Sequence, residues 1–135
     1  MEHVARNVDG GGPDLPLRLG RLLLSVIFIA GGLDAVRQPE PKMPKIHDAD
    51  LPVPRPTLTT QLNGAAMVAA GSALALGIRP KIAASVLAVS LVPTTIVGHP
   101  FWKIEDEQAA AMQQIQFMKN LGLLGGLMGV IASEG

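Results

Sequence analysis

The chain has 135 residues, a length that suits one domain. Hydrophobic residues make up 48% of it and charged residues only 16%, whereas a soluble domain averages roughly a quarter charged residues. Basic and acidic side chains balance at 11 each, so the chain lacks the excess positive charge typical of nucleic-acid binding. Because cysteine is absent, thiol–disulfide chemistry, iron–sulfur ligation and thiolate metal sites are excluded within this chain.

A polar tail over residues 1–14 precedes the first long apolar segment, which runs from about 15 to 36. Arg18 and Arg21 lie in its opening turns, where long basic side chains can reach the membrane interface. A secretory signal also combines a basic start with an apolar run, but residues 31–34 (Gly-Gly-Leu-Asp) show no cleavage pattern. We therefore interpret this segment as a membrane span.

The next segment, residues 37–57, contains six prolines, at positions 39, 41, 44, 52, 54 and 56. Proline lacks a backbone N–H and breaks helix interiors and central strands. This density predicts a long connection without regular helix, extended over one face of the molecule.

Three further apolar segments follow, at about 58–78, 82–98 and 108–132, with a tight basic turn at Arg79-Pro80-Lys81. A span needs about 20 predominantly apolar residues. The helices of a soluble bundle each carry a polar face, and residues 65–78 carry one polar side chain, Ser72. The sequence predicts an all-α membrane domain over 15–135, an antiparallel bundle of four transmembrane helices with the proline-rich loop between helices 1 and 2.

Small residues recur at intervals that suit close packing of membrane helices. In the second segment they form a ladder of Ala65, Ala69, Ala73 and Gly77, and in the fourth the pairs Gly122–Gly126 and Gly125–Gly129. We expect both ladders to meet neighbouring helices. Pro93 predicts a curved third helix, with hydroxyls at Thr94 and Thr95 available to the carbonyl that the proline frees.

Polar side chains concentrate in one half of the predicted bundle. We call the end that carries the N-terminus the proximal end and the opposite end the distal end. Because antiparallel helices alternate in direction, five polar residues of the spans all fall in the distal half: Asp34, Asn63, His99, Lys119 and Asn120. Ionisable residues inside a membrane are costly and by default indicate function. We expect a quinone-binding or other polar pocket there.

Lys119 shares one helix face with Gly122, Gly126 and Gly129 at 100° per residue, so we expect its ammonium to point inward. Asp34 is then its nearest carboxylate partner. Two alternatives stay open: Asp34 can pair with Arg37 at i+3, and the Lys119 side chain can extend toward the interface.

His99 lies at a helix end, in the sequence Gly-His-Pro-Phe-Trp at 98–102. It can transfer a proton or donate a hydrogen bond to a quinone, or it can simply cap the helix. Trp102 is predicted to be an interfacial anchor. A single membrane histidine does not supply a pair of axial haem ligands, no metal-binding cluster is visible, and no serine–histidine–acid set or phosphate loop occurs. We expect no intrinsic cofactor and no metal.

Four stretches resemble the DoxX family of small four-helix bacterial integral membrane proteins: residues 21–32, 71–80, 93–102 and 116–126. The most specific are His-Pro-Phe-Trp at 99–102 and Phe-x-Lys-Asn-Leu-x-x-x-Gly-Gly at 117–126, and the similarity covers about 18–131. The family resembles the membrane subunit of thiosulfate:quinone oxidoreductase, and some members are linked to redox assemblies and oxidative-stress defence. Several relatives carry a glutamate in the second helix, which residues 66–69 (Ala-Met-Val-Ala) lack.

The resemblance implies an accessory subunit of a quinone-linked oxidoreductase or redox assembly, not catalytic alone, with a quinone or a lipid as its bound ligand. It implies a multi-pass protein of the bacterial plasma membrane with both termini in the cytoplasm, in contact with other membrane subunits or with further copies of itself. The alternative is a structural adaptor that scaffolds partner proteins and binds no ligand.

Overall fold

The computed structural model describes residues 14–48 and 52–133, and these residues are helical wherever they form regular structure. The all-α class predicted from the sequence is confirmed. Four long helices account for most of the described chain: α2 (Asp14–Arg37), α4 (Pro56–Leu76), α5 (Pro80–Gly98) and α6 (Glu107–Ser133). Three short ones connect them: η1 (Glu40–Lys42), α3 (Met43–Asp48) and η2 (Phe101–Lys103). Apart from Asp14, the predicted polar tail lies outside the described residues.

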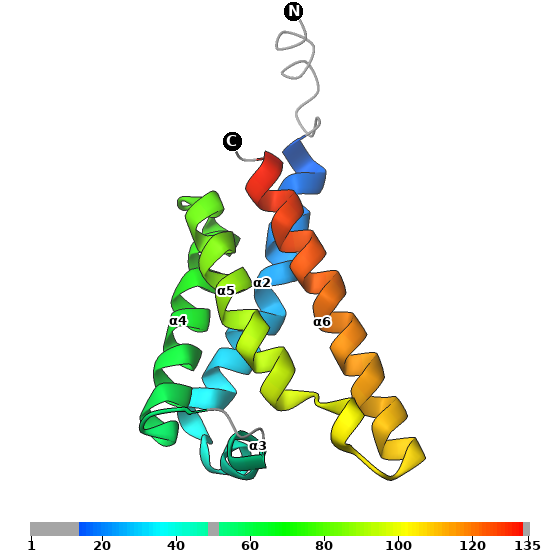
Figure 1. The fold of residues 1–135 in the computed structure, drawn as a ribbon. Helices are drawn as coiled ribbons and strands as arrows, with labels where there is room; N and C mark the ends of the chain where they lie inside the picture. The colour runs from blue at the N-terminus through cyan, green and yellow to red at the C-terminus, as the bar shows by residue number, and fades with distance from the viewer. Residues whose placement is uncertain (1–13, 49–51, 134–135) are drawn as a thin grey trace, which may run out of the picture.

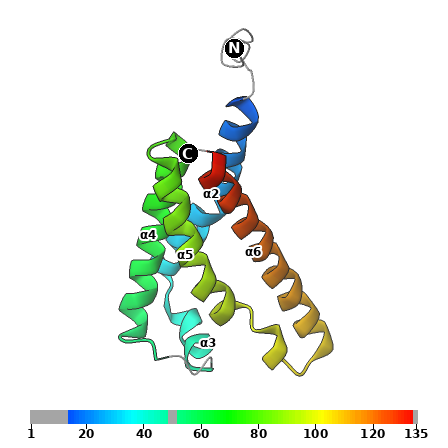
Figure 2. The ribbon, with the colours of Figure 1, turned by 45° about the horizontal axis from the view of Figure 1, so that its top comes forward.

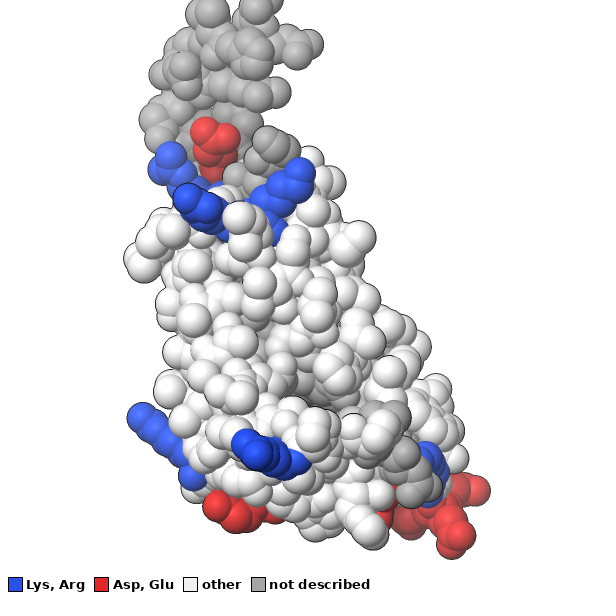
Figure 3. All heavy atoms as spheres, turned by 60° about the vertical axis from the view of Figure 1, so that its left-hand side comes forward, with Lys and Arg blue, Asp and Glu red and all other residues white. Residues whose placement is uncertain are grey.

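Three stretches within the described ranges are long and apolar enough to cross a membrane: α2, Pro80–Lys103, which begins with α5, and α6. α4 is not among them, because Gln61 and Asn63 and its many alanines and glycines lower its hydropathy. On the face seen in Figure 3, a broad belt of uncharged side chains separates charged side chains at the two ends. The protein is therefore a membrane protein.

Consecutive long helices pack along each other: α2 along α4, α4 along α5, and α5 along α6, and the α2–α4 contact is the most extensive. α2 and α6 meet over a shorter stretch, where Leu24 lies against Gly126, and they diverge toward the distal end (Figures 1 and 2). The start of α2 and the end of α6 lie at the proximal end, whereas α3 and the α5–α6 connection lie at the distal end.

The closest helix contact is the crossing of α2 and α4 at two glycines. A Cβ atom added to Gly32 would lie 2.5 Å from the Gly64 carbonyl oxygen, and one added to Gly64 would lie 2.6 Å from the Gly32 oxygen. Only glycine permits backbones to approach this closely. The predicted alanine ladder is not this contact face, because Ala65 and Ala69 are exposed.

One large apolar side chain from each long helix is fully buried in the shared core. These are Phe28 of α2, Leu74 of α4, Leu87 of α5 and Leu127 of α6, each at most 2% exposed. In a membrane such contacts stabilise through van der Waals packing rather than through removal of apolar surface from water. The core therefore depends on close fit.

The glycine ladder of α6 departs from the prediction. A Cβ atom added to Gly122, Gly125 or Gly129 would have no neighbouring atom within 4 Å, and Gly126 alone of the four touches another helix. The helix instead buries Leu127 and Val130 against its neighbours. The expectation that the whole ladder meets other helices of the same chain was wrong, because α6 turns Leu127 and Val130 toward its neighbours and only Gly126 of the ladder is in contact.

The proline-rich segment also differs from the prediction, since η1 and α3 place residues 40–48 in helical turns. Pro39 is the N-cap residue of η1, Pro41 lies in the first turn of η1, and Pro44 is the second residue of α3. Backbone N–H groups in the first turn of a helix have no partner within the helix, so a proline there loses no hydrogen bond. The fixed φ of proline also suits the helical conformation. The rule that proline breaks helices applies to helix interiors and not to first turns.

Candidate functional site

Polar side chains of α5 point toward both of its neighbours in the distal half. Ser90 and Thr94 face α4, and Thr95 and His99 face α6. Ser90 and Thr95 are each 6% exposed, so their hydroxyls are buried. Two polar seams result, one on each side of α5.

The α4–α5 seam centres on Asn63. Its side-chain Nδ2 donates to Thr94 Oγ1 at 3.3 Å, and its Oδ1 accepts a short hydrogen bond from the Ser90 hydroxyl. Thr94 donates in turn to the Ser90 carbonyl at 2.8 Å. A buried amide without partners in an apolar medium costs several kcal/mol, roughly 2–7. The two hydroxyls of α5 therefore make Asn63 tolerable in α4.

The α5–α6 seam has two levels. At the deeper level Asn120, which is 5% exposed, donates from Nδ2 to Thr95 Oγ1 at 3.0 Å. One turn nearer the distal surface, His99 Nδ1 and Gln113 Oε1 are 2.6 Å apart. The amide oxygen accepts this bond, so Nδ1 carries the proton and Nε2 of a neutral ring keeps its lone pair.

Three aromatic rings close the distal end of this seam. Phe101, Trp102 and Phe117 form mutual edge-to-face contacts, with ring centroids 5.3 to 5.8 Å apart. This geometry is favoured by ring quadrupoles and holds η2 against α6. Trp102 is 52% exposed, as an interfacial anchor would be. Gln113 and Phe117 are one turn apart on α6, so the polar and aromatic contacts are adjacent.

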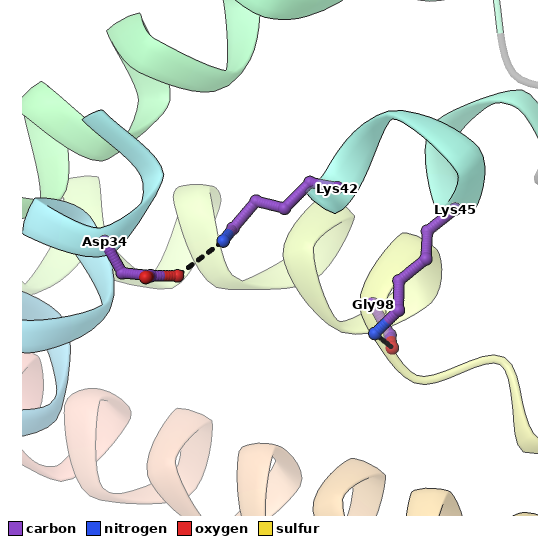
Figure 4. A network of polar contacts seen from close by, with 4 residues as sticks. All are labelled: Asp34, Lys42, Lys45 and Gly98. Atoms are coloured by element: carbon purple, nitrogen blue, oxygen red, sulfur yellow. Dashed lines mark hydrogen bonds and ion pairs between the residues drawn. The ribbon is translucent and has the colours of Figure 1, made fainter. Parts of the chain in front are cut away.

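Asp34 and Lys119 lie apart from the seams and from each other. Asp34 pairs with Lys42 at 2.6 Å, because η1 brings Lys42 back over the end of α2 (Figure 4). Lys119 is exposed and donates to Gln116 Oε1 at 2.7 Å. The prediction of an inward Lys119 paired with Asp34 was wrong. Both side chains of the Asp34–Lys42 pair are more than a third exposed, so it contributes at most about 1 kcal/mol.

Two other lysines fasten α3 over the distal end of α5. Lys45 donates to the Gly98 carbonyl at 3.2 Å, visible in Figure 4, and Lys103 donates to the Asp48 carbonyl at 3.0 Å. Gly98 is the last residue of α5, so Lys45 places positive charge at a helix C-terminus, where the macrodipole favours it. The proline-rich segment thus covers the distal end of the helix that carries both seams.

Of the five predicted pocket residues, Asn63, His99 and Asn120 flank α5, and Asp34 and Lys119 do not. Sequence reasoning did not single out Ser90, and it assigned Thr94 and Thr95 to the proline kink. Their hydroxyls instead bond the Ser90 and Leu91 carbonyls and the two asparagines. The spacing of three hydroxyls at 90, 94 and 95 was the signal for a helix polar on two sides. No cluster of three potential metal ligands occurs within 14–48 and 52–133.

A family model described as DoxX matches residues 17–100, more than half of the chain. The chain belongs to the DoxX family. No curated protein and no solved structure matches it. The DoxX match runs from α2 through α5, so it contains the whole α4–α5 seam but only the α5 side of the α5–α6 seam.

Proposed function

We propose that this DoxX protein is an accessory membrane subunit of a quinone-linked redox assembly. In this proposal α2, α4, α5 and α6 all cross the bacterial plasma membrane as an antiparallel bundle, with both termini in the cytoplasm. The observation that carries it is the α5–α6 seam, where a buried amide lies beneath a histidine–amide pair and an aromatic cluster. The resemblance to the membrane subunit of thiosulfate:quinone oxidoreductase supports the same assignment.

A quinone head group is a flat ring with two carbonyl acceptors, and it needs hydrogen-bond donors and apolar contact. Asn120 Nδ2 has a second hydrogen besides the one it gives to Thr95, and His99 can donate from Nε2 when its ring is protonated, so the seam offers donors at two depths. Phe117 lies between Gln113 and Asn120 on α6. Hydrogen bonds in this low-dielectric setting are stronger than in water. Reduction to the quinol takes two electrons and two protons. A partner subunit would supply the electrons, and His99, half-buried at the distal end, would pass protons.

Quinone content tests the proposal directly. The intact protein, purified from its own membranes, should contain quinone detectable by chromatography of an organic extract. Asn120→Leu and His99→Leu should each lower that content and the quinone-linked activity several-fold. Lys119→Met is the matched control, since Lys119 lies outside the seam, and it should change neither. Wild-type protein without quinone, together with unchanged activity in both seam variants, would overturn the proposal.

A second function, the structural adaptor, is favoured by the exposed face of α6. Lys119 lies 12 residues into this helix, roughly 18 Å along its axis, and Gly122 and Gly129 on the same face are uncovered within the chain. Small residues suit close approach of another helix, and an ammonium at this depth favours a carboxylate partner. A symmetric second copy on this face would bring two Lys119 side chains together, so charge favours an acidic helix of a different protein.

Charge reversal separates the adaptor from the quinone subunit. Lys119→Glu should release partner proteins and reduce the size of the complex on native gels, whereas Lys119→Arg should retain it. Quinone content should be unchanged in both variants, because the seam is untouched. If the complex keeps its size with Lys119→Glu, this face of α6 does not bind an acidic partner.

A further inference from the structure

A groove runs between α4 and α5 in the proximal half, whereas both polar seams lie in the distal half. It has a volume of about 420 Å³, is open on its outer side, and has an almost entirely apolar lining. Ala69, Ala70 and Ala73 of α4 form its floor, Ile82 and Val86 of α5 form a wall, and it ends at the turn that carries Arg79.

The small side chains of α4 give the groove its depth. From Ala66 to Ala73 the lining covers two helical turns, roughly 10 Å of axis. A second helix would need an interaxial distance of about 8–10 Å along a surface cleared of larger side chains, but Ile82 and Val86 stand beside this floor and are 56% and 40% exposed. The volume lies in the lower range of small-ligand sites, roughly 300–1,000 Å³. The groove therefore fits a narrow apolar chain.

The mouth of the groove is cationic. Arg79 is exposed, and its side chain has no hydrogen bond or ion pair with any described residue. The Lys81 side chain, two residues further along, is also exposed and also has no hydrogen bond or ion pair with any described residue. Both lie at the start of α5, where the macrodipole also favours negative charge. Within the described ranges, Asp14 is the acidic residue of the proximal end, and the basic residues there outnumber it.

We infer that this groove binds one acyl chain of an anionic phospholipid from the surrounding bilayer, with the phosphate held by Arg79 and Lys81. The apolar floor and the cationic mouth together match the two ends of such a molecule. The site is separate from the proposed quinone site, since it lies in the proximal half of the α4–α5 pair and shares no residue with either seam.

The experiment titrates the detergent-solubilised full-length protein with phosphatidylglycerol and counts bound lipid by native mass spectrometry. One phosphatidylglycerol should bind in preference to phosphatidylcholine. Arg79→Gln should weaken it about fivefold, the effect of roughly one basic residue at an anionic surface. Arg55→Gln is the matched control, because Arg55 is also an exposed N-cap arginine with positive φ before a proline, but it is not among the residues that line the groove.

A second pair of variants tests the groove rather than its charge. Ala69→Leu fills the floor and should remove the preferential binding, whereas Ala65→Leu, on the same ladder but outside the lining, should leave it intact. Equal weakening by Arg79→Gln and Arg55→Gln, equal binding of both lipids, or unchanged binding with Ala69→Leu would each overturn the inference. Helicity and elution volume verify that the variants are folded.

Discussion

At the scale of single residues, the polar groups inside this apolar protein are matched across helices. Asn63 and Asn120 each find a hydroxyl of α5, and His99 finds the Gln113 amide. The sequence predicted that Asn63, His99 and Asn120 lie in the distal half. It could not predict the pairing, because the rotation of each helix about its axis decides whether a side chain meets a neighbour or lipid. Lys119 is an example. It lies in the distal half, but its side chain does not point inward as the sequence predicted.

The Asn120–Thr95 hydrogen bond should be measurable as a coupling energy. Asn120→Leu and Thr95→Val should each destabilise the protein, and the double variant should lose less than the sum by roughly 0.6–1.7 kcal/mol, the range for hydrogen bonds between membrane helices. Unfolding in mixed micelles measures this. Asn120→Leu combined with Ser90→Ala should be additive, because Ser90 faces α4. Additivity in both cycles would show that the Asn120–Thr95 bond contributes nothing.

A side chain at position 77 should lower the unfolding free energy of the protein. It ends α4 with φ +72°, and a Cβ there would lie 3.3 Å from Arg21 Nη2. Gly77→Ala should therefore lower the unfolding free energy by about 1 kcal/mol or more. The control is Gly20→Ala, because Gly20 lies within α2 with nothing within 4 Å of an added Cβ. That substitution should be neutral or slightly stabilising; equal losses in both variants would contradict this reading of Gly77.

At the scale of elements, the long helices were predictable from the lengths of the apolar segments, and their partners were not. α4 carries small residues on two faces, one with Ala65 and Ala69 and one with Gly64 and Gly71, and spacing alone treats them alike. The structure uses the glycine face, because Gly64 meets a second glycine, Gly32, and the two carbonyls can then approach. Sequence periodicity describes one helix at a time, whereas this contact depends on two.

The α2–α4 crossing should be the most sensitive helix contact. Gly32→Ala or Gly64→Ala forces the backbones apart and should destabilise the protein by about 1–3 kcal/mol, as overpacking of a close contact does. Gly125→Ala on α6, with open space around the added Cβ, is the control and should have little effect on the unfolding of the isolated chain. Thermal unfolding in detergent distinguishes them. If Gly125→Ala destabilises the protein more than Gly32→Ala or Gly64→Ala does, another molecule must pack against this face of α6 in solution.

At the scale of the whole molecule, charge separates the two ends. The described residues at the proximal end are mainly basic, including Arg18, Arg79 and Lys81, whereas the distal end mixes both signs (Figure 3). In the sequence, five basic residues flank the spans at each end, so their number alone does not fix the orientation; they are Arg6, Arg18, Arg21, Arg79 and Lys81 at the proximal end and Arg37, Lys42, Lys45, Arg55 and Lys103 at the distal end. The membrane location was predictable from composition. The packing of the proline-rich segment as helical turns on the distal end was not, because it depends on tertiary contacts of Lys42 and Lys45.

Topology can be tested cleanly because the chain has no cysteine. If α4 crosses the membrane, Arg55→Cys and Arg79→Cys should react with an impermeant maleimide from opposite sides, since these residues precede and follow that helix. Labelling of intact and permeabilised cells gives the readout. Glu105→Cys should label from the same side as position 55. Positions 55 and 79 on one side would mean that α4 does not span the bilayer.

The succession of helix contacts also bears on how the protein is made. Each long helix after α2 has an extensive contact with its predecessor in the chain, whereas α2 and α6 share a smaller contact at Leu24 and Gly126. A helix emerging from the ribosome into the membrane therefore finds its main partner already inserted. Local pairing of this kind lowers the entropy lost in bringing partners together. We expect the α2–α4 pair to form during synthesis, before α6 has been translated.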